Sequence, residues 1–165
     1  MDERTLPGES PRRYVTRLAL AKARAVAERY PNRWVVGADT VVVVDGKLLG
    51  KPDGRRDAVR MLQRLSGRGH RVVSGIALAH RESGIARSAV STTRVFFRRL
   101  TERDILRYVA TGEPLDKAGA YAIQGRGGIF VERIEGSFSN VVGFPLEKFL
   151  ELWKSRLKAR PRPSS

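Results

Sequence analysis

The sequence predicts a mixed α/β fold, in which helices flank a mixed sheet that contains long hairpins. Three observations favour it: segments with helical spacing of apolar residues alternate with β-branched runs, two long β-rich segments meet at a short turn, and no internal repeat is present. Long hairpins argue against a regular βαβ array. The 165 residues, 41% of them hydrophobic, suffice for one sizeable core. We therefore expect one domain over residues 1–157, followed by a disordered basic tail over residues 158–165.

The first predicted element is a helix over residues 11–30. Ser10 can serve as its N-cap, and Pro11 suits its first turn. Its apolar residues recur at helical spacing, namely Val15, Leu18, Ala19, Ala23 and Val26. Lys22 lies just beside this apolar stripe.

Residues 33–50 predict two strands joined by a tight turn at Asp45-Gly46. The run from Val41 to Val44 is typical of a central strand that is buried on both faces. A helix over residues 56–65 follows, because its apolar residues share one helical face: Ala58, Met61, Leu62 and Leu65.

The second half predicts a long hairpin, with strands over residues 70–79 and 85–97. Thr101 can cap the next helix, which is expected to run to about residue 110. Its inward face is predicted to hold Ile105, Leu106 and Val109. A glycine-rich loop then leads to a strand over residues 129–134. Pro145 opens the last helix, whose buried stripe is expected to be Leu146, Phe149, Leu150 and Trp153.

The net charge of +15, from 32 Lys and Arg against 17 Asp and Glu, attracts polyanions. Nucleic acid, a phosphate ligand or bare solubility would each account for this charge. We do not expect nucleic acid as a partner, because most aromatic residues fall on predicted core faces rather than among exposed basic side chains.

The chain contains no cysteine, which excludes disulfides and thiolate metal sites, so any metal has to be held by oxygen or by one of two histidines. His70 and His80 lie too far apart to share one metal, and neither is expected to be catalytic. The apolar runs are too short to cross a bilayer, and Met1 is followed by charged residues. We therefore expect a cytoplasmic protein with no membrane partner.

Asp39 and Thr40 follow Gly37-Ala38 and place a carboxylate and a hydroxyl between two hydrophobic strand segments. Charge there is costly unless it is used or paired. Asp39 is expected at a strand end, either as a metal ligand or base, or as a turn-former satisfied by backbone amides. Lys51 follows the hairpin and is expected near the Asp39 end of the sheet, where it either holds a phosphate or is a solvated turn lysine.

Asp116-Lys117 and Gln124 lie in a glycine-rich loop, where backbone can approach a ligand and an amide can read the edge of a base. Asn140 is either a ligand contact or a turn residue, and the turn is favoured. No Walker loop, dinucleotide fingerprint, serine-triad elbow or zinc spacing is present.

Six sequence blocks occur in order: Asp2-Glu3; Tyr14-Val15-x-Arg17-Leu18-Ala19-x-x-Lys22-Ala23; Gly37-Ala38-Asp39-Thr40-Val41-Val42; Gly50-Lys51-Pro52; Gly112-Glu113-Pro114-x-Asp116-Lys117-Ala118-Gly119-x-Tyr121-x-Ile123-Gln124-Gly125; and Asn140-Val141-Val142-Gly143-x-Pro145. Together they closely resemble the Maf family of nucleotide pyrophosphatases, from Asp2 to about Leu152. Several blocks at compatible spacing are a strong signal, unlike any one of them alone.

The resemblance implies a fold like that of inosine triphosphate pyrophosphatases, with two lobes around a cleft. It also implies that a divalent cation, Mg²⁺ or Mn²⁺, helps water to cleave a nucleoside triphosphate between its α and β phosphates. Asp39 would then be the proton acceptor and a metal ligand, and Glu3 a second acidic group near the metal. Lys22, Lys51 and Lys117 would neutralise phosphate charge.

At Thr40 and Gln124 the sequence resembles the branch of the Maf family that is specific for dTTP and UTP. This resemblance implies a pyrimidine nucleotide as the substrate. A homodimer is also compatible with the resemblance.

The sequence departs from the family pattern at its beginning. Maf chains start with a strand, a Ser-x-Ser-Pro-Arg-Arg loop and a helix ahead of the Asp-Glu pair, which stands here at Asp2-Glu3. Ser10-Pro11-Arg12-Arg13 repeats the letters of that loop at a helix start, so we assign it no phosphate binding. On this basis we expect the chain to lack serine and arginine contacts to the triphosphate, each contributing on the order of 1.5–3 kcal/mol. An uncovered sheet edge is expected too.

Three hypotheses remain at this stage, in order of preference. The first is an active dTTP/UTP pyrophosphatase. The second, motivated by the missing loop, is a nucleotide-binding domain with impaired catalysis. The third, motivated by the charge, is a basic nucleic-acid-binding or cell-division regulatory protein.

Overall fold

The computed structural model describes residues 4–156, which form a five-stranded antiparallel sheet with helices on both of its faces. The helices are α1 (Pro11–Ala27), α2 (Arg55–Leu65), α3 (Glu102–Ala110), α4 (Phe138–Val142) and α5 (Leu146–Ser155). The strands are β1 (Val35–Val44), β2 (Lys47–Leu49), β3 (Gly69–His80), β4 (Ile85–Phe97) and β5 (Val131–Glu135). Short 3-10 helices are η1 (Glu113–Asp116), η2 (Ala118–Ala120) and η3 (Arg126–Phe130). The predicted mixed α/β class with flanking helices is confirmed, but the predicted mixed sheet is wrong for residues 4–156, because neighbouring strands pair there in antiparallel orientation. The predicted tail, 158–165, lies outside the described residues.

The sheet has the strand order β2-β1-β3-β4-β5, so the long β3–β4 hairpin forms its centre. β1 pairs with β3 along nearly its whole length, whereas β2 covers only Val42, Val43 and Val44 on the other side of β1. Within residues 4–156, no strand pairs with the β2 side of β1 from Val35 to Val41. The middle of β1 is therefore an edge of the sheet.

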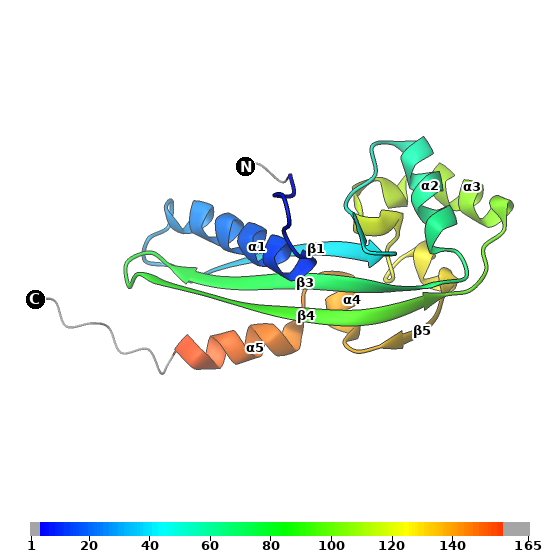
Figure 1. Ribbon diagram of the computed structural model, residues 1–165. Coiled ribbons are helices and arrows are strands. Elements are labelled where there is room, and N and C mark those ends of the chain that lie inside the picture. The colour runs from blue at the N-terminus through cyan, green and yellow to red at the C-terminus, as the bar shows by residue number, and fades with distance from the viewer. Residues whose placement is uncertain (1–3, 157–165) are drawn as a thin grey trace, which may run out of the picture.

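The helices divide between the two ends of the long strands (Figure 1). α1 lies on one face of the sheet near the β3–β4 turn, and α4 and α5 lie on the opposite face. α2, α3 and the 3-10 helices gather at the other end. Helix α1 approaches β1 closely at Gly37, where a Cβ atom would overlap the backbone at Ala19 and Ala23. This close approach brings α1 within side-chain reach of the middle of β1.

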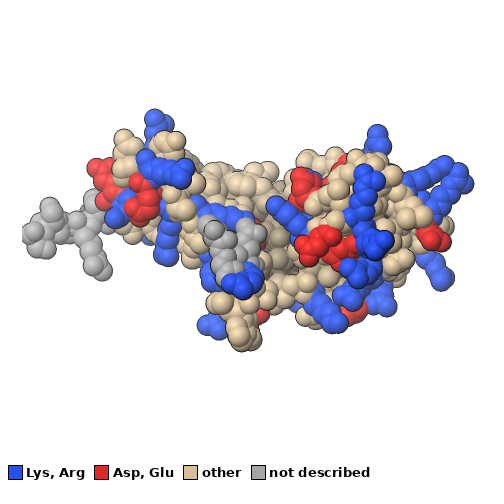
Figure 2. All heavy atoms as spheres, turned by 90° about the horizontal axis from the view of Figure 1, so that it is seen from above, with Lys and Arg blue, Asp and Glu red and all other residues tan. Residues whose placement is uncertain are grey.

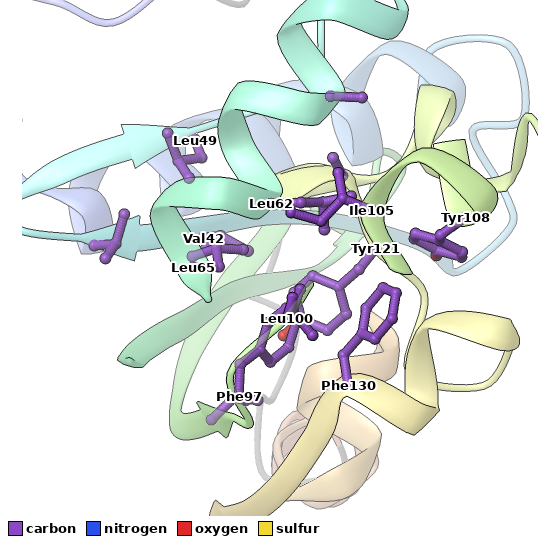
Figure 3. Close-up of a cluster of buried hydrophobic side chains, with 14 of the residues drawn as sticks. Val42, Leu49, Leu62, Leu65, Phe97, Leu100, Ile105, Tyr108, Tyr121 and Phe130 are labelled. Carbon is purple, nitrogen blue, oxygen red and sulfur yellow. The ribbon is translucent and has the colours of Figure 1, made fainter. Parts of the chain in front are cut away.

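The largest buried cluster lies between α2, α3, the 3-10 helices and the sheet (Figure 3). Its aromatic rings meet edge to face, with 4.7 Å between the ring centroids of Phe97 and Tyr121 and 5.0 Å between those of Tyr108 and Phe130. Such geometry adds stabilisation beyond the buried area. This cluster fixes the segment after α3 against the end of β1.

Local signals in the sequence predicted most element boundaries. The Ser10 hydroxyl accepts a hydrogen bond from the Arg13 N–H and caps α1, as predicted. Thr101 and Asp104 form a reciprocal capping box at the start of α3. The four consecutive valines of β1, Val41–Val44, are all buried, which confirms the predicted burial on both faces.

Several predicted inward faces were wrong. Val26 is 45% exposed because α1 turns Ala27 inward instead, and Leu106 is 51% exposed because Tyr108 completes the inward stripe of α3. In α5 the predicted stripe fails at Leu146 and Leu150, both exposed, because the helix presents Leu152 to the sheet. Phe149 and Trp153 do pack beside Leu152. The predicted strand 129–134 begins only at Val131, because η3 occupies the preceding residues.

Candidate active site

Lys22 and Asp39 meet at the stretch of β1 that, within residues 4–156, pairs with β3 alone. The Lys22 ammonium donates a hydrogen bond of 2.5 Å to Asp39 Oδ1, and the Asp39 side chain is only 11% exposed. Asp39 lies in the middle of β1, not at a strand end as predicted, and is in register with Gly75 of β3. The pairing depends on the close packing of α1 at Gly37, since Lys22 lies between the two alanines that contact this glycine. A carboxylate that is shielded in this way needs a cationic partner.

Thr40 points to the opposite face of the sheet, because successive side chains of a strand alternate. Its hydroxyl lies 2.8 Å from the Ser74 hydroxyl, which donates to the carbonyl of Asn140 in α4. The Asn140 side chain is fully buried and donates to the carbonyl of Val72 and the hydroxyl of Thr93. Asn140 therefore anchors α4 to the sheet. The favoured prediction of a turn residue is wrong, because Asn140 lies within α4.

A cleft of about 1080 Å³ runs across this edge and touches both faces. Lys22 and Asp39 line it on the α1 side, and Thr40 and Gly143 on the α4 side. Its volume slightly exceeds the range of roughly 300–1,000 Å³ that is typical of small-molecule sites. The cleft is therefore large enough for a nucleotide.

The far wall of the cleft comes from the α2–α3 end of the molecule. Lys51, exposed after β2, lines this wall together with Lys117 and Gln124. The Lys117 ammonium is 3.2 Å from an Asp116 oxygen. Gly119 N–H donates to the carbonyl of Gly50, which ties the two basic segments together.

Of the seven residues to which the family resemblance assigns a role, six line a single cleft: Lys22, Asp39, Thr40, Lys51, Lys117 and Gln124. Glu3, the seventh, lies outside the described residues. His70 is buried with its Nε2 2.8 Å from the Tyr121 hydroxyl, and burial lowers its pKa to about 4. Arg12 and Arg13 do not line the cleft, in keeping with a helix start.

Other charged or polar residues line the cleft without having been predicted as site residues: Arg4, Tyr14, Asp53 and Glu113. Tyr14 and Glu113 lie in the motif blocks, where no role was assigned to them. The Glu113 carboxylate is held by backbone groups, because it accepts hydrogen bonds from the N–H groups of Arg126 and Gly127. Burial alone would raise the pKa of Glu113, but these bonds and one from Tyr108 outweigh it and lower the pKa. The glycines of its loop indicated close packing, but the sequence did not show which side chain packs against them.

The charge of the surface is not confined to the cleft. Figure 2 shows Lys and Arg side chains along the length of the face seen from above, interrupted by acidic groups. Among the described residues, no helix is long and apolar enough to cross a membrane. In the same part of the chain, no three His, Asp or Glu side chains form a group able to hold a metal ion by themselves.

Comparison with known proteins indicates the same family as the motif blocks. The chain is 53% identical to a dTTP/UTP pyrophosphatase of Geobacter sulfurreducens over 150 residues, which cover 90% of this chain and 78% of the relative. It is 55% identical to a dTTP/UTP pyrophosphatase of Anaeromyxobacter dehalogenans, over 88% of this chain and 74% of the relative. A third protein of that name, from Syntrophotalea carbinolica, is 49% identical over 98% of this chain and 76% of the relative. The family model described as Maf-like protein matches residues 1–156, and the chain belongs to the Maf family.

Proposed function

We propose that this protein is a pyrophosphatase that hydrolyses dTTP and UTP to the nucleoside monophosphate and pyrophosphate. The observation that carries the proposal is the Lys22–Asp39 pair, held in a nucleotide-sized cleft beside Lys51 and Lys117. The activity named in relatives that are about half identical over three quarters of their length supports it.

Cationic side chains in the cleft would bind the triphosphate. Lys22 on one side and Lys51 and Lys117 on the other can each neutralise a phosphate oxygen. Such contacts stabilise the charge that develops on the leaving pyrophosphate. They also place the anhydride bonds next to Asp39.

Asp39 is proposed as the proton acceptor. Water attacks the α phosphorus, the bond from that phosphorus to the bridging oxygen breaks, and the proton of the water passes to the Asp39 carboxylate. Lys22 keeps this carboxylate oriented in the cleft through its 2.5 Å hydrogen bond. A carboxylate that is positioned within reach of the attacking water increases the rate of hydrolysis by general base catalysis.

The chemistry of the site fits a divalent cation such as Mg²⁺ or Mn²⁺. Mg²⁺ is commonly bound by one or two carboxylates together with substrate phosphates, so a complete protein cage is not needed. Asp39 supplies one carboxylate in the cleft, and Glu3 is the proposed second ligand. A bound cation would neutralise phosphate charge and acidify water.

Thr40 and Gln124 are proposed to contact the base. Both line the cleft, one on β1 and the other in the loop before η3. A side-chain amide can donate to and accept from the edge of a pyrimidine.

We also propose a domain organisation, an oligomeric state and a cellular compartment for this protein. Residues 1–157 would form one domain whose two lobes enclose the cleft, as in inosine triphosphate pyrophosphatases. A homodimer would use exposed apolar side chains of α4 and α5, such as Phe138, Leu146 and Leu150. The compartment would be the cytoplasm. Light scattering of the purified protein tests the dimer.

The experiment is pyrophosphate release from dTTP and UTP by the purified chain, with Mg²⁺ and then with excess EDTA. The expected result is release that EDTA abolishes. Binding of dTTP without any release would instead favour the catalytically impaired nucleotide-binding domain, and no binding of either nucleotide would reject both functions.

A further inference from the structure

Glu113 is a carboxylate in the cleft that the proposed reaction does not use. It is the first residue of η1, four positions before Lys117. It belongs to the same cleft wall as Gln124, but the two lie in different segments. Its role has therefore to be sought in the contacts that it makes.

The Glu113 carboxylate binds the backbone of the turn that follows Gln124. Oε1 accepts from the Arg126 N–H at 3.1 Å, and Oε2 accepts from the Gly127 N–H at 3.2 Å. Hydrogen bonds from backbone donors to an ionised acceptor are among the stronger ones in proteins. The carboxylate thus holds two consecutive peptide groups of η3.

Two further contacts hold the chain around Gln124 in the same way. The Tyr108 hydroxyl contacts the Glu113 carboxylate and accepts from the Ala122 N–H at 3.0 Å, so residues on both sides of Gln124 are tied to one anchor. A Cβ atom at Gly125 would overlap the Glu113 carboxylate. The chain after Gln124 therefore wraps directly around this side chain.

We propose that Glu113 is a positioning residue that sets base selectivity: by holding the turn after Gln124, it keeps the Gln124 amide where it can read a pyrimidine base. The inference rests on the proposed function, because it assumes that Gln124 faces the base. A carboxylate suits this task better than an amide, since both of its oxygens accept and both of the backbone groups donate.

The test is the ratio of the dissociation constants for dCTP and dTTP, measured by calorimetry in EDTA so that no turnover is needed. Gln124→Ala is expected to reduce this ratio about tenfold, which is the value of roughly one hydrogen bond. Glu113→Gln should reduce it by about three- to tenfold. The double variant should bind like Gln124→Ala alone, because coupled residues are not additive.

Asp104→Asn is the matched control. Asp104 also accepts a backbone N–H, that of Thr101, and binds Arg98, but it does not line the cleft. This control should lower the melting temperature and leave the ratio unchanged. Glu113→Asp, which keeps the charge, covers the case in which Glu113→Gln fails to fold, and an intermediate ratio is expected for it.

Three results would overturn the proposal: equal binding of dCTP and dTTP by the unmodified protein, an unchanged ratio in both Glu113 variants, or effects of Glu113→Gln and Gln124→Ala that multiply. Pyrophosphate release from dTTP with Mg²⁺ is measured in parallel. Selectivity that behaves as expected in a protein without release would support Glu113 and reject the proposed reaction, so the two failures are distinguishable.

Discussion

Lys22 of α1 and Asp39 of β1 are joined by a hydrogen bond of 2.5 Å at the one stretch of β1 that has no second strand beside it among residues 4–156. A strand edge leaves backbone groups unpaired, and here it also places a largely buried carboxylate with its counter-ion at the wall of a nucleotide-sized cleft. The pair therefore links the geometry of the sheet to the proposed chemistry.

Asp39→Asn should abolish most turnover while leaving the fold in place. The amide keeps the shape of the carboxylate but neither accepts a proton at neutral pH nor binds a cation well. We expect pyrophosphate release from dTTP to fall by about 100-fold or more. Steady-state kinetics measures this, with circular dichroism as the check on folding. Turnover within a few-fold of the unmodified protein would refute the assigned role.

Lys22→Met should weaken both substrate binding and turnover. Methionine preserves much of the aliphatic stem but removes the ammonium that contacts Asp39 and faces the cleft. We expect KM for dTTP to rise and kcat to fall, each by about tenfold, because a charge-assisted contact is lost in both states. Lys22→Arg, which retains the charge, should recover part of the loss. A variant that changed only the melting temperature would reduce Lys22 to a structural role.

Gly37→Ala should impair activity by moving α1 away from β1. Its Cβ would overlap the backbone at Ala19 and Ala23, so α1 has to shift, at a cost of about 1–3 kcal/mol in stability. Turnover should fall with it, since the same shift separates Lys22 from Asp39. Urea denaturation measures the change in the free energy of unfolding. Gly50→Ala, with nothing within 4 Å of the added carbon, is the control and should change stability by less than about 0.5 kcal/mol.

His70 should make the fold less stable in mild acid. Its pKa is about 4 in the folded protein against 6.5 in the unfolded chain, because burial penalises the charged ring. A depressed folded pKa means that the unfolded state binds the proton first, so stability is retained above pH 6.5 and declines as the pH falls toward 4. Between pH 7 and pH 5 the loss from this group is about 2 kcal/mol.

The measurement is the free energy of unfolding in urea at pH 7 and at pH 5. His70→Phe should show a drop smaller by about 2 kcal/mol, even if the variant is less stable at both values. Equal drops in His70→Phe and in the unmodified protein would contradict the prediction.

The sequence alone determined the features that depend on interactions between residues close together in the chain. The Ser10 cap, the Thr101 capping box and the turn at Asp45-Gly46 each depend on neighbouring residues, and all are present. The ordered motif blocks likewise pointed to the Maf family, which the family match confirms. Such signals survive in a single sequence because the partners lie within a few positions of each other.

Tertiary structure decided what depends on packing between distant segments. The sequence could not tell that Asp39 lies in mid-strand, that Leu152 rather than Leu146 faces the sheet, or that Glu113 holds the turn after Gln124. In each case several local arrangements have similar free energy, and long-range contacts select one of them. The glycine at position 37 is visible in the sequence, but only the packing of α1 against it shows why Lys22 reaches Asp39.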